Sequence, residues 1–396
     1  MFSARTAWDR TENPLAIAIE DAKAEGRPLV DLTESNPTRV GLFDLTTCVA
    51  ELGHPRGGLY EPAPLGHREG RGAVASYYAA RGLRADPERV VLSASTSEAY
   101  SWIFTLLCDP EDAILVPRPS YPLLSWIAQN QRVHLVPYPL RREAHFRVDL
   151  GALEGSIDRR TRAIVLIHPN NPTGSFIRKD EAEALCELAR EHDLALIVDE
   201  VFGDYALAPL PNDVLPSFVD ISPDVAPLTF VLSGLSKVLL LPQCKLAWTV
   251  VSGPDALVAE ALARLEFVAD TFLSVSTPVQ LALAPLLERR PAIARAVRER
   301  LVSNLATLDR ALSNLGPASP VRRLPMLGGW YAILEVPRIH DEDRWVELLV
   351  REEGVIVHPG YFFDFDRDGF LVVSLLQPAG PFGEAVERLT RRLLVG

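Results

Sequence analysis

Between about residues 70 and 250, short apolar runs alternate with segments in which apolar residues recur every three or four positions. The runs are typical of buried strands, and the wider spacing is typical of amphipathic helices. The pattern predicts strands at 89–94, 112–117, 133–138, 161–169, 194–200 and 228–232. It predicts helices at 70–82, 97–108, 123–130 and 179–192.

Two of the expected strands, 161–169 and 194–200, are continuously apolar rather than alternating. Such strands are buried on both faces, as in a parallel sheet that helices cover from both sides. The helix expected between them, 179–192, begins with acidic residues and ends near Arg190 and His192, which suits the helix dipole. The order of elements predicts an α/β protein with a largely parallel central sheet.

The pattern changes after about residue 285. A long arginine-rich helical segment over 287–315 precedes an expected strand at 330–337, a helix at 343–354 and a strand at 370–376. These elements predict a smaller α+β domain packed rigidly on the first, because no low-complexity linker separates the two. The polar, proline-rich stretch 212–227 predicts a surface loop.

Composition narrows the class of partner. The 396 residues suffice for two domains, and 40 Lys plus Arg against 52 Asp plus Glu leave a formal net charge of −12. This balance argues against nucleic acid or an anionic membrane as the main partner, although a local basic pocket can still bind phosphate. The net charge does not indicate which substrate the protein binds.

The sequence carries no pattern typical of export or metal binding. Charges lie within the first ten residues, and the longest apolar stretches are far shorter than the ~20 residues that span a bilayer. The cysteines Cys48, Cys108, Cys186 and Cys244 form no CxxC pair, so neither a zinc site nor a redox motif is indicated. We expect a cytoplasmic protein with free thiols and no bound metal.

Lys237, which ends the segment SGLSK, follows the strand expected at 228–232. A lysine at the end of a buried strand is costly unless it has a partner, forms a Schiff base or has a lowered pKa. The alternative is a lysine whose stem lies along apolar surface while its charge stays in water.

Other polar groups follow strands of the same kind. HPNNPTG (168–174) follows one buried strand and VDE (198–200) ends the next, so both are expected at the carboxyl edge of the sheet, where open α/β folds bind ligands. SASTSEAY (93–100) joins a strand to a helix and places hydroxyl groups at the helix N-terminus. That arrangement suits a phosphate, although serine and threonine are also ordinary helix caps.

Taken together, NNPTG (170–174), DEVF (199–202) and SGLSKVLLLPQCK (233–245) resemble the fold-type I, pyridoxal-phosphate-dependent aminotransferases of classes I and II. The motifs occur in the order of that family and at about its spacing. The resemblance extends over nearly the whole chain, from 31–42 to 370–376.

This resemblance implies a three-layer α/β/α large domain with a mostly parallel sheet at 46–285. Residues 1–45 and 286–396 would form a smaller α+β domain. It also implies pyridoxal 5′-phosphate as the cofactor. The implied reaction is ping-pong transfer of an amino group from an amino acid to a 2-oxo acid or a related carbonyl compound.

The resemblance assigns four residues to the cofactor ring. Lys237 matches the lysine that forms the Schiff base and then carries the proton, and Asp199 matches the acid that keeps the pyridine nitrogen protonated. Asn171 matches the asparagine that hydrogen-bonds the ring oxygen O3′, and Tyr121 matches the aromatic residue that stacks on the ring. The predicted catalytic residues are Lys237, Asp199 and Tyr121.

The phosphate contacts implied by the resemblance come from hydroxyl groups and one charge: Ser95, Thr96, Ser97, Ser236 and Lys245. Lys245 stands where most members carry arginine, so a point charge replaces a bidentate fork. Tyr60 resembles the tyrosine that reaches the phosphate in the other subunit, which implies a homodimer with shared active sites.

Phe202 departs from the family, which usually has a tyrosine there that donates a second hydrogen bond to O3′. Without that donor the deprotonated imine loses stabilisation, so we predict a raised pKa for the imine on Lys237. Tyr205, in the next turn of the chain, is an alternative donor.

Val372 stands where most members carry the arginine that clamps the substrate α-carboxylate. Either another cation binds the carboxylate, or the substrate has none at that point. Arg39, close to Asn36 in SNPTRVGL, is the leading replacement, with a surface position as its alternative. His358 and Tyr361 are further candidates for the substrate site.

Other functions compete with the aminotransferase interpretation. Val372 keeps open a lyase, a decarboxylase or a cyclising synthase on the same scaffold, because the carboxylate clamp helps to set which bond to Cα breaks. A ligand-sensing regulator is disfavoured by the acidic charge and the lack of a helix-turn-helix, and a nicotinamide dehydrogenase by the lack of GxGxxG. The substrate is not readable, since Trp330 and Tyr331 suit either an aromatic pocket or the core.

Overall fold

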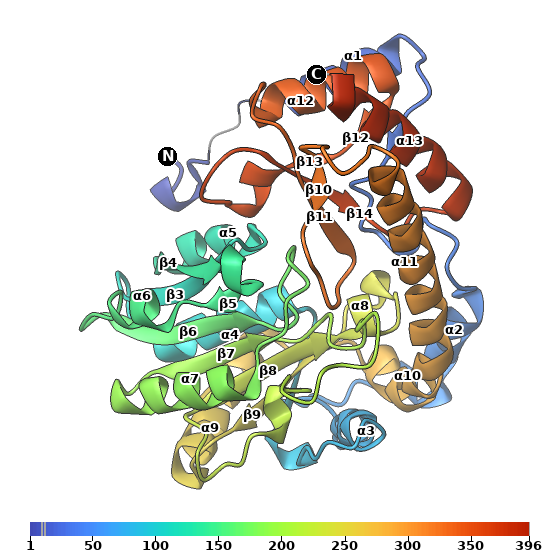
Figure 1. Ribbon diagram of the computed structural model, residues 1–396. Coiled ribbons are helices and arrows are strands. Elements are labelled where there is room, and N and C mark those ends of the chain that lie inside the picture. The colour runs from blue at the N-terminus through green and yellow to red at the C-terminus, as the bar shows by residue number, and fades with distance from the viewer. Residues whose placement is uncertain (9–10, 12, 396) are drawn as a thin grey trace.

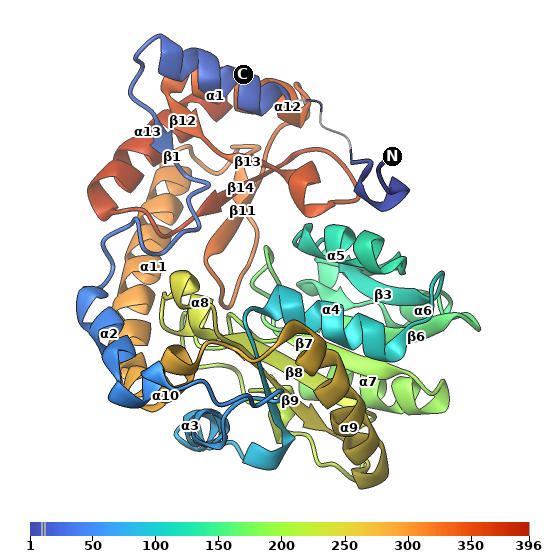
Figure 2. The same cartoon turned by 180° about the vertical axis from the view of Figure 1, so that it is seen from behind.

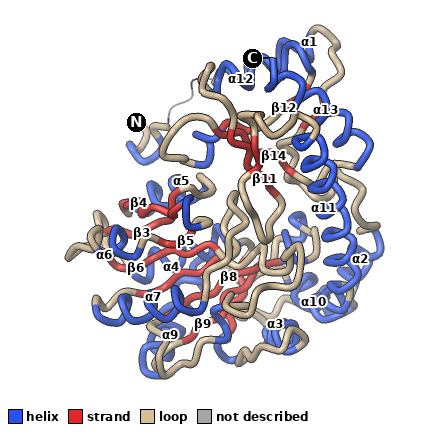
Figure 3. The backbone as a smooth tube through the Cα atoms, viewed as in Figure 1, coloured by secondary structure: helices blue, strands red, loops and turns tan. Residues whose placement is uncertain are grey.

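The structure is a computed structural model that describes residues 1–8, 11 and 13–395. Its larger part is built on an eight-stranded sheet with the order β2-β9-β8-β7-β6-β3-β4-β5 (Figures 1 and 3). Strands β8, β7, β6, β3 and β4 are parallel neighbours, whereas β9 is antiparallel to β2 and β8, and β5 to β4. The strands are β2 (Val90–Ser93), β3 (Ala113–Arg118), β4 (His134–Arg141), β5 (Arg147–Val148), β6 (Thr161–Ile167), β7 (Ala195–Asp199), β8 (Thr229–Gly234) and β9 (Ala247–Ser252).

Helices cover this sheet on both faces because its central strands are apolar on both. Ala163 and Val165 of β6 belong to one apolar cluster with residues of α4, α5 and α9, while Ile164 and Leu166 belong to a second cluster with residues of α3 and α7 (Figures 1 and 2). The helices are α3 (Arg68–Ala79), α4 (Thr96–Leu107), α5 (Leu123–Gln131), α6 (Leu150–Glu154), α7 (Lys179–Glu191), α8 (Leu235–Val238) and α9 (Asp255–Phe272). The predicted three-layer α/β/α architecture with a mostly parallel sheet is confirmed.

A smaller antiparallel sheet has the order β10-β11-β14-β13. Its strands are β10 (Arg322–Arg323), β11 (Tyr331–Glu335), β13 (His358–Pro359) and β14 (Phe370–Ser374). Around it lie α10 (Thr277–Glu288), α11 (Arg290–Ser313), α12 (Glu342–Leu348) and α13 (Ala379–Val395). The smaller α+β part of the prediction is therefore also confirmed.

The N-terminal segment packs on this smaller part. Strand β1 (Val30–Asp31) pairs in parallel with β12 (Val355–Ile356), and α1 (Pro14–Ala24) lies beside α12 (Figure 2). Helix α2 (Thr46–Ala50) leads from it toward α10 (Figure 2). The domain boundaries at residues 45 and 285 stay predictions. Among the described residues, no helix combines the length and apolar composition of a membrane span.

The helical segment expected at 287–315 differs from the structure at its start. Helix α10 ends at Glu288, and α11 begins at Arg290 with Pro291 in its first turn. Because proline lacks an N–H group and clashes with the preceding turn, it favours the start of a new helix over the continuation of an old one.

The expected surface loop at 212–227 is confirmed only in part: the stretch contains no α-helix and exposes Asn212, Asp213 and residues 222–225, but its middle is buried. Val214, Leu215 and Phe218 are buried, and the Phe218 N–H donates to Glu200 at 2.7 Å. Proline and polar residues dominate the stretch, yet its few apolar side chains reach the core and the buried carboxylate of Glu200 satisfies its backbone.

Candidate active site

A cavity of about 310 Å³ lies at the carboxyl ends of the central strands, with Tyr331 of β11 forming the wall from the small sheet. Among the described residues that line it, the charged ones are Asp199, Lys237 and Lys245. The other polar residues in its wall are Ser35, Ser95, Thr96, Ser97, Tyr100, Tyr121, Asn171, Ser236 and Tyr331.

The topology of the large sheet explains why these residues meet. Strands β6, β7 and β8 are parallel neighbours, so the segments that follow them emerge at one edge with Asn171, Asp199 and Lys237. Strand β3 leads to Tyr121 in the same way, and β2 leads into α4, whose N-cap is Ser95.

Lys237 lies against aromatic rings at the base of the cavity. Its Nζ is 4.7 Å from the ring centroid of Trp330 and 5.5 Å from that of Phe202. Burial lowers the pKa of Lys237 to about 8, although the nearby Asp199 acts in the opposite direction. About a tenth of the amine is therefore unprotonated at pH 7, far more than for an ordinary lysine, and this is the form that attacks carbonyl carbons.

Asp199 is held through both carboxylate oxygens. Oδ1 accepts the Val201 N–H at 3.0 Å, and Oδ2 accepts the Tyr100 hydroxyl at 3.2 Å. Burial raises the pKa of Asp199 to about 6, against these hydrogen bonds and Lys237. Asp199 is consequently mostly ionised at neutral pH. Because its pKa lies near neutrality, a neighbouring group can readily change its protonation.

Asn171 presents an unmet hydrogen-bonding group to the cavity. Its side-chain oxygen is buried and accepts no hydrogen bond from any described residue. A buried polar atom without a partner is costly, so a ligand that hydrogen-bonds this amide would relieve the cost.

Opposite this group lies a set of donors suited to an anion. Ser95 caps α4 by accepting the Glu98 N–H at 3.1 Å, and Thr96 and Ser97 begin the helix with backbone N–H groups that have no intrahelical partner. The positive end of the helix dipole, the hydroxyl groups and Lys245 together favour a phosphate group.

The residues predicted to bind the cofactor lie together in this cavity, except for one. Tyr60 is 64% exposed and lies outside the cavity wall. Its predicted role is in another subunit's site, so its place in a single chain leaves that prediction untested.

The residues predicted for the substrate do not line the cavity: Asn36, Arg39, Trp330, His358 and Tyr361. In two cases the adjacent residue does, namely Ser35 and Tyr331. Along an extended chain successive side chains point to opposite faces, so an error of one residue moves a prediction from the cavity to the core or the surface.

Each of the five has another environment. Arg39 is 74% exposed and lies 3.8 Å from Glu34. The Asn36 side chain accepts hydrogen bonds from Thr38, and the Tyr361 hydroxyl donates to Asp343.

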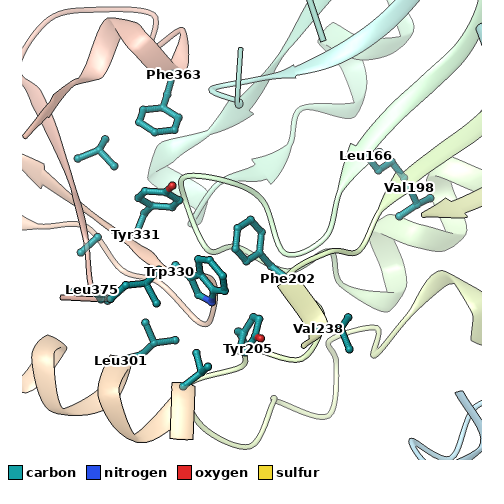
Figure 4. Packing of buried hydrophobic residues seen from close by; sticks show 14 of the residues in the cluster. Leu166, Val198, Phe202, Tyr205, Val238, Leu301, Trp330, Tyr331, Phe363 and Leu375 are labelled. Carbon is teal, nitrogen blue, oxygen red and sulfur yellow. The ribbon is translucent and has the colours of Figure 1, made fainter. Parts of the chain in front are cut away.

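The other two substrate candidates lie among aromatic residues. Trp330 is fully buried against Phe202 and Tyr205 (Figure 4). His358 stacks on Phe362 at 4.7 Å, and burial lowers its pKa to about 4.

Tyr205 does not supply the hydrogen bond that Phe202 lacks. Its hydroxyl donates to the backbone carbonyl of Lys237. Its ring packs on Trp330, outside the cavity wall (Figure 4). Tyr100, by contrast, lines the cavity without having been predicted. Its position four residues after Thr96, on one face of α4, is the signal in the sequence that points to it.

Comparison with known proteins identifies the class. The family model described as aminotransferase class I and II matches residues 55–389, and the chain belongs to this family. It is therefore a transaminase, and its cofactor is pyridoxal 5′-phosphate, on which the family depends.

The individual relatives differ in substrate. The chain is 26% identical to mouse tyrosine aminotransferase over 396 residues, covering 96% of this chain and 85% of the relative. It is 28% identical to Mycobacterium tuberculosis alanine aminotransferase over 380 residues, covering 93% and 86%.

Solved structures agree on the fold. An alanine aminotransferase from Pyrococcus furiosus superposes with a TM-score of 0.86 at 23% identity, covering 99% of both chains. Thermus thermophilus aspartate aminotransferase with maleate superposes with a TM-score of 0.82 at 26% identity, again covering 99% of both. Tyrosine, alanine and aspartate enzymes thus share this architecture, so the fold selects no amino donor.

The cavity fits pyridoxal 5′-phosphate. The N-terminus of α4 with Lys245 suits the phosphate, and Asp199 suits the ring nitrogen. Asn171 lines the same cavity, where its amide nitrogen can donate to a ring oxygen, and Lys237 lies in the wall of that cavity too.

Proposed function

We propose that this transaminase moves an amino group in two half-reactions, from an amino acid to the cofactor and from there to a 2-oxo acid or a related carbonyl compound. The observation that carries the proposal is the Lys237 amine, whose pKa burial lowers to about 8 in a cavity that also holds Asp199. When bound, pyridoxal phosphate supplies an aldehyde that links to amines and a ring that takes up the electron pair released at the substrate α-carbon.

The residues of the chain divide the remaining work. Lys237 would hold the cofactor covalently through Nζ, and its free amine would be the base that moves the proton at the substrate α-carbon. Asp199 keeps a proton on the ring nitrogen through its negative charge. Tyr121 covers one face of the ring, and Asn171 donates to the ring oxygen.

The test is a half-reaction. Cofactor-loaded protein given amino acids without a carbonyl acceptor is expected to convert one equivalent of cofactor to pyridoxamine phosphate, measured by absorbance and chromatography. Lys237→Ala should slow the conversion on the order of a thousandfold. Lys179→Ala, which removes an exposed lysine at the start of α7, is the matched control.

The small sheet supports an unusual mode of carboxylate recognition. Val372 pairs directly with Ile333 and His358, so these side chains share one face of the sheet. Tyr331 pairs with Ser374 two positions along the strands from Ile333 and Val372, so its side chain is on the same face. Tyr331 also lines the cavity. None of the five is lysine or arginine, and the lowered pKa of His358 leaves that ring neutral at pH 7.

We propose that Arg39 supplies the missing charge. It follows Ser35 of the cavity wall by four residues, and its contact with Glu34, at 3.8 Å in an exposed position, is weak enough to be exchanged for a substrate carboxylate. The neutral face around Val372 also favours a second candidate function, a lyase, decarboxylase or cyclising synthase. That function predicts product release without accumulation of pyridoxamine phosphate in the half-reaction.

A homodimer with shared active sites is part of the same proposal. Leu59 and Tyr60 are exposed apolar side chains, and so are Phe272 and Leu273 on a neighbouring segment. The Ala63 N–H donates to Ser274 at 2.7 Å, which joins the two segments into one surface. Burial of such a surface against a second copy would remove it from water and bring Tyr60 to the partner's phosphate site.

We also propose a cytoplasmic location. The four cysteines are unpaired thiols, three of them buried, as is usual in a reducing compartment.

A further inference from the structure

Tyr100 lies between the two ends of the cofactor site. It is on α4 one turn after Thr96, is 3% exposed and lines the cavity. Its hydroxyl donates to Oδ2 of Asp199 at 3.2 Å, across 99 residues of sequence. The helix whose N-terminus faces the phosphate therefore also contacts the carboxylate that faces the ring nitrogen.

The tyrosine is a fixed, neutral donor. Its ring packs edge-on against Phe104 at 5.9 Å, which restricts its side-chain rotation. Burial, and next to it the charge of Asp199, raises the pKa of Tyr100 well above its usual value, so the hydroxyl keeps its proton. A hydrogen bond from such a group favours the charged form of its acceptor.

The other groups around Asp199 have different roles. The N–H of Val201, in the following turn, donates to Oδ1. The positive charge of Lys237, after β8, lowers the pKa of Asp199. Glu200, the next residue on the chain, directs its carboxylate to Ser217 and Phe218. Tyr100 is thus a side chain on helix α4 that donates a hydrogen bond to Asp199 at the end of strand β7.

We propose that Tyr100 is a positioning residue for Asp199, whose hydroxyl stabilises the ionised carboxylate and aims it at the ring nitrogen of the bound cofactor. The proposal rests on the function proposed above. The proton between the carboxylate and the ring nitrogen is shared according to their relative affinities, so a destabilised carboxylate draws the proton away from the ring. A ring without that proton is a weaker acceptor of electrons.

The test compares Tyr100→Phe with wild type after loading with pyridoxal phosphate labelled with 15N in its ring. The expected result is a 15N signal shifted toward that of neutral pyridine. We also expect a fall in kcat of about tenfold, corresponding to one pKa unit, with KM for the amino donor unchanged. Tyr100→Leu, a second variant without the hydroxyl, should move the 15N signal the same way.

Tyr138→Phe is the matched control. Tyr138 is also a buried tyrosine and lies near Tyr100, but its hydroxyl donates to the backbone carbonyl of Val165 and it does not line the cavity. This variant should leave the 15N signal and kcat unchanged, whatever it does to stability. An unchanged 15N signal in folded Tyr100→Phe overturns the proposal, as does a signal that Tyr138→Phe shifts equally.

A cycle with Asp199→Asn separates positioning from general packing. If Tyr100 acts through Asp199, the double variant should show the same 15N signal and kcat as Asp199→Asn alone. Additive losses contradict the proposal. The 15N measurement requires cofactor binding but no turnover, so it stays informative even if no amino donor is converted and the proposed transamination fails.

Discussion

The amine of Lys237 lies near two aromatic rings, those of Phe202 and Trp330. At position 202 the family usually has a tyrosine, whose hydroxyl group is missing here. The Tyr205 hydroxyl donates to the backbone carbonyl of Lys237. Aromatic faces favour a cation, whereas burial disfavours it, and burial dominates in the lowered pKa of the free lysine. The consequence is that Phe202 offers no hydrogen bond to the ring oxygen, which leaves Asn171 as the proposed donor among the described residues of the cavity wall.

Phe202→Tyr tests that consequence. A phenol at this position would donate to the ring oxygen and stabilise the deprotonated linkage between Lys237 and the cofactor, so its pKa should fall by about one unit from the wild-type value. The measurement is a pH titration of the visible absorbance of the loaded protein. The same pKa in both proteins would show that Phe202 does not set it, and Phe202→Leu controls for the loss of the aromatic ring.

Arg39→Ala tests the proposed carboxylate contact. Loss of a cation that binds the substrate carboxylate should raise KM for the amino donor by roughly tenfold or more, since such a contact contributes about 1.5–3 kcal/mol. Steady-state kinetics of both variants against wild type make the comparison, and Arg264→Ala, an exposed ion-paired arginine on α9, is the control. An unchanged KM removes Arg39 from the site.

At the scale of elements, a buried ion network ties α11 to the loop that follows β7. Asp204, two residues beyond Phe202, has a fully buried side chain and accepts hydrogen bonds from Arg290 at 2.9 and 2.5 Å. Arg81 at the end of α3 lies 3.6 Å away and also donates to the Tyr77 hydroxyl. The small part of the molecule is thereby fixed to the segment that carries Phe202.

Asp204→Asn should destabilise the protein strongly. Removal of the negative charge leaves two partly buried guanidinium groups uncompensated, at a cost of about 3 kcal/mol, or a Tm lower by roughly 3–4 °C for a chain of this length. Asp309→Asn, which breaks the more exposed pair with Arg323, should cost about 0–1 kcal/mol. Thermal unfolding followed by circular dichroism compares the two, and equal losses would contradict the distinction.

The elements also show where sequence patterns suffice. The helix over 179–192 and the strands over 161–169 and 194–200 occur as α7, β6 and β7 within a few residues. The continuous apolar runs of β6 and β7 predict that these strands are buried on both faces. The buried middle of the loop 212–227 could not be predicted in the same way, because Ser217 and Phe218 are held by Glu200, a partner outside the stretch.

The whole molecule is expected to function as a pair. Sedimentation should give about twice the 43.6 kDa of one chain at micromolar concentration. If Tyr60 completes the partner's site, mixing the impaired variants Tyr60→Ala and Lys237→Ala should restore activity, because one site of each mixed dimer has both residues intact. No restoration after verified subunit exchange would place Tyr60 outside the shared site.

The fold class and the cofactor set follow from the sequence because their signals are local. Asn171, Asp199 and Lys237 each follow a strand that can be recognised from its own residues, and parallel neighbours end at a common edge. The same local motifs carry the likeness to the aminotransferase family. The absence of arginine at Val372 is equally visible in the chain.

Tertiary structure alone decided which groups surround these residues. The contacts of Tyr100 with Asp199, of Trp330 with Lys237 and of Arg290 with Asp204 join positions 86 to 99 residues apart, and no pattern within either segment encodes the partner. The tertiary structure also placed Ser35 and Tyr331, rather than their neighbours Asn36 and Trp330, at the cavity. Sequence patterns report what a residue is and which element carries it, whereas packing in three dimensions sets its neighbours and thereby its proton affinity.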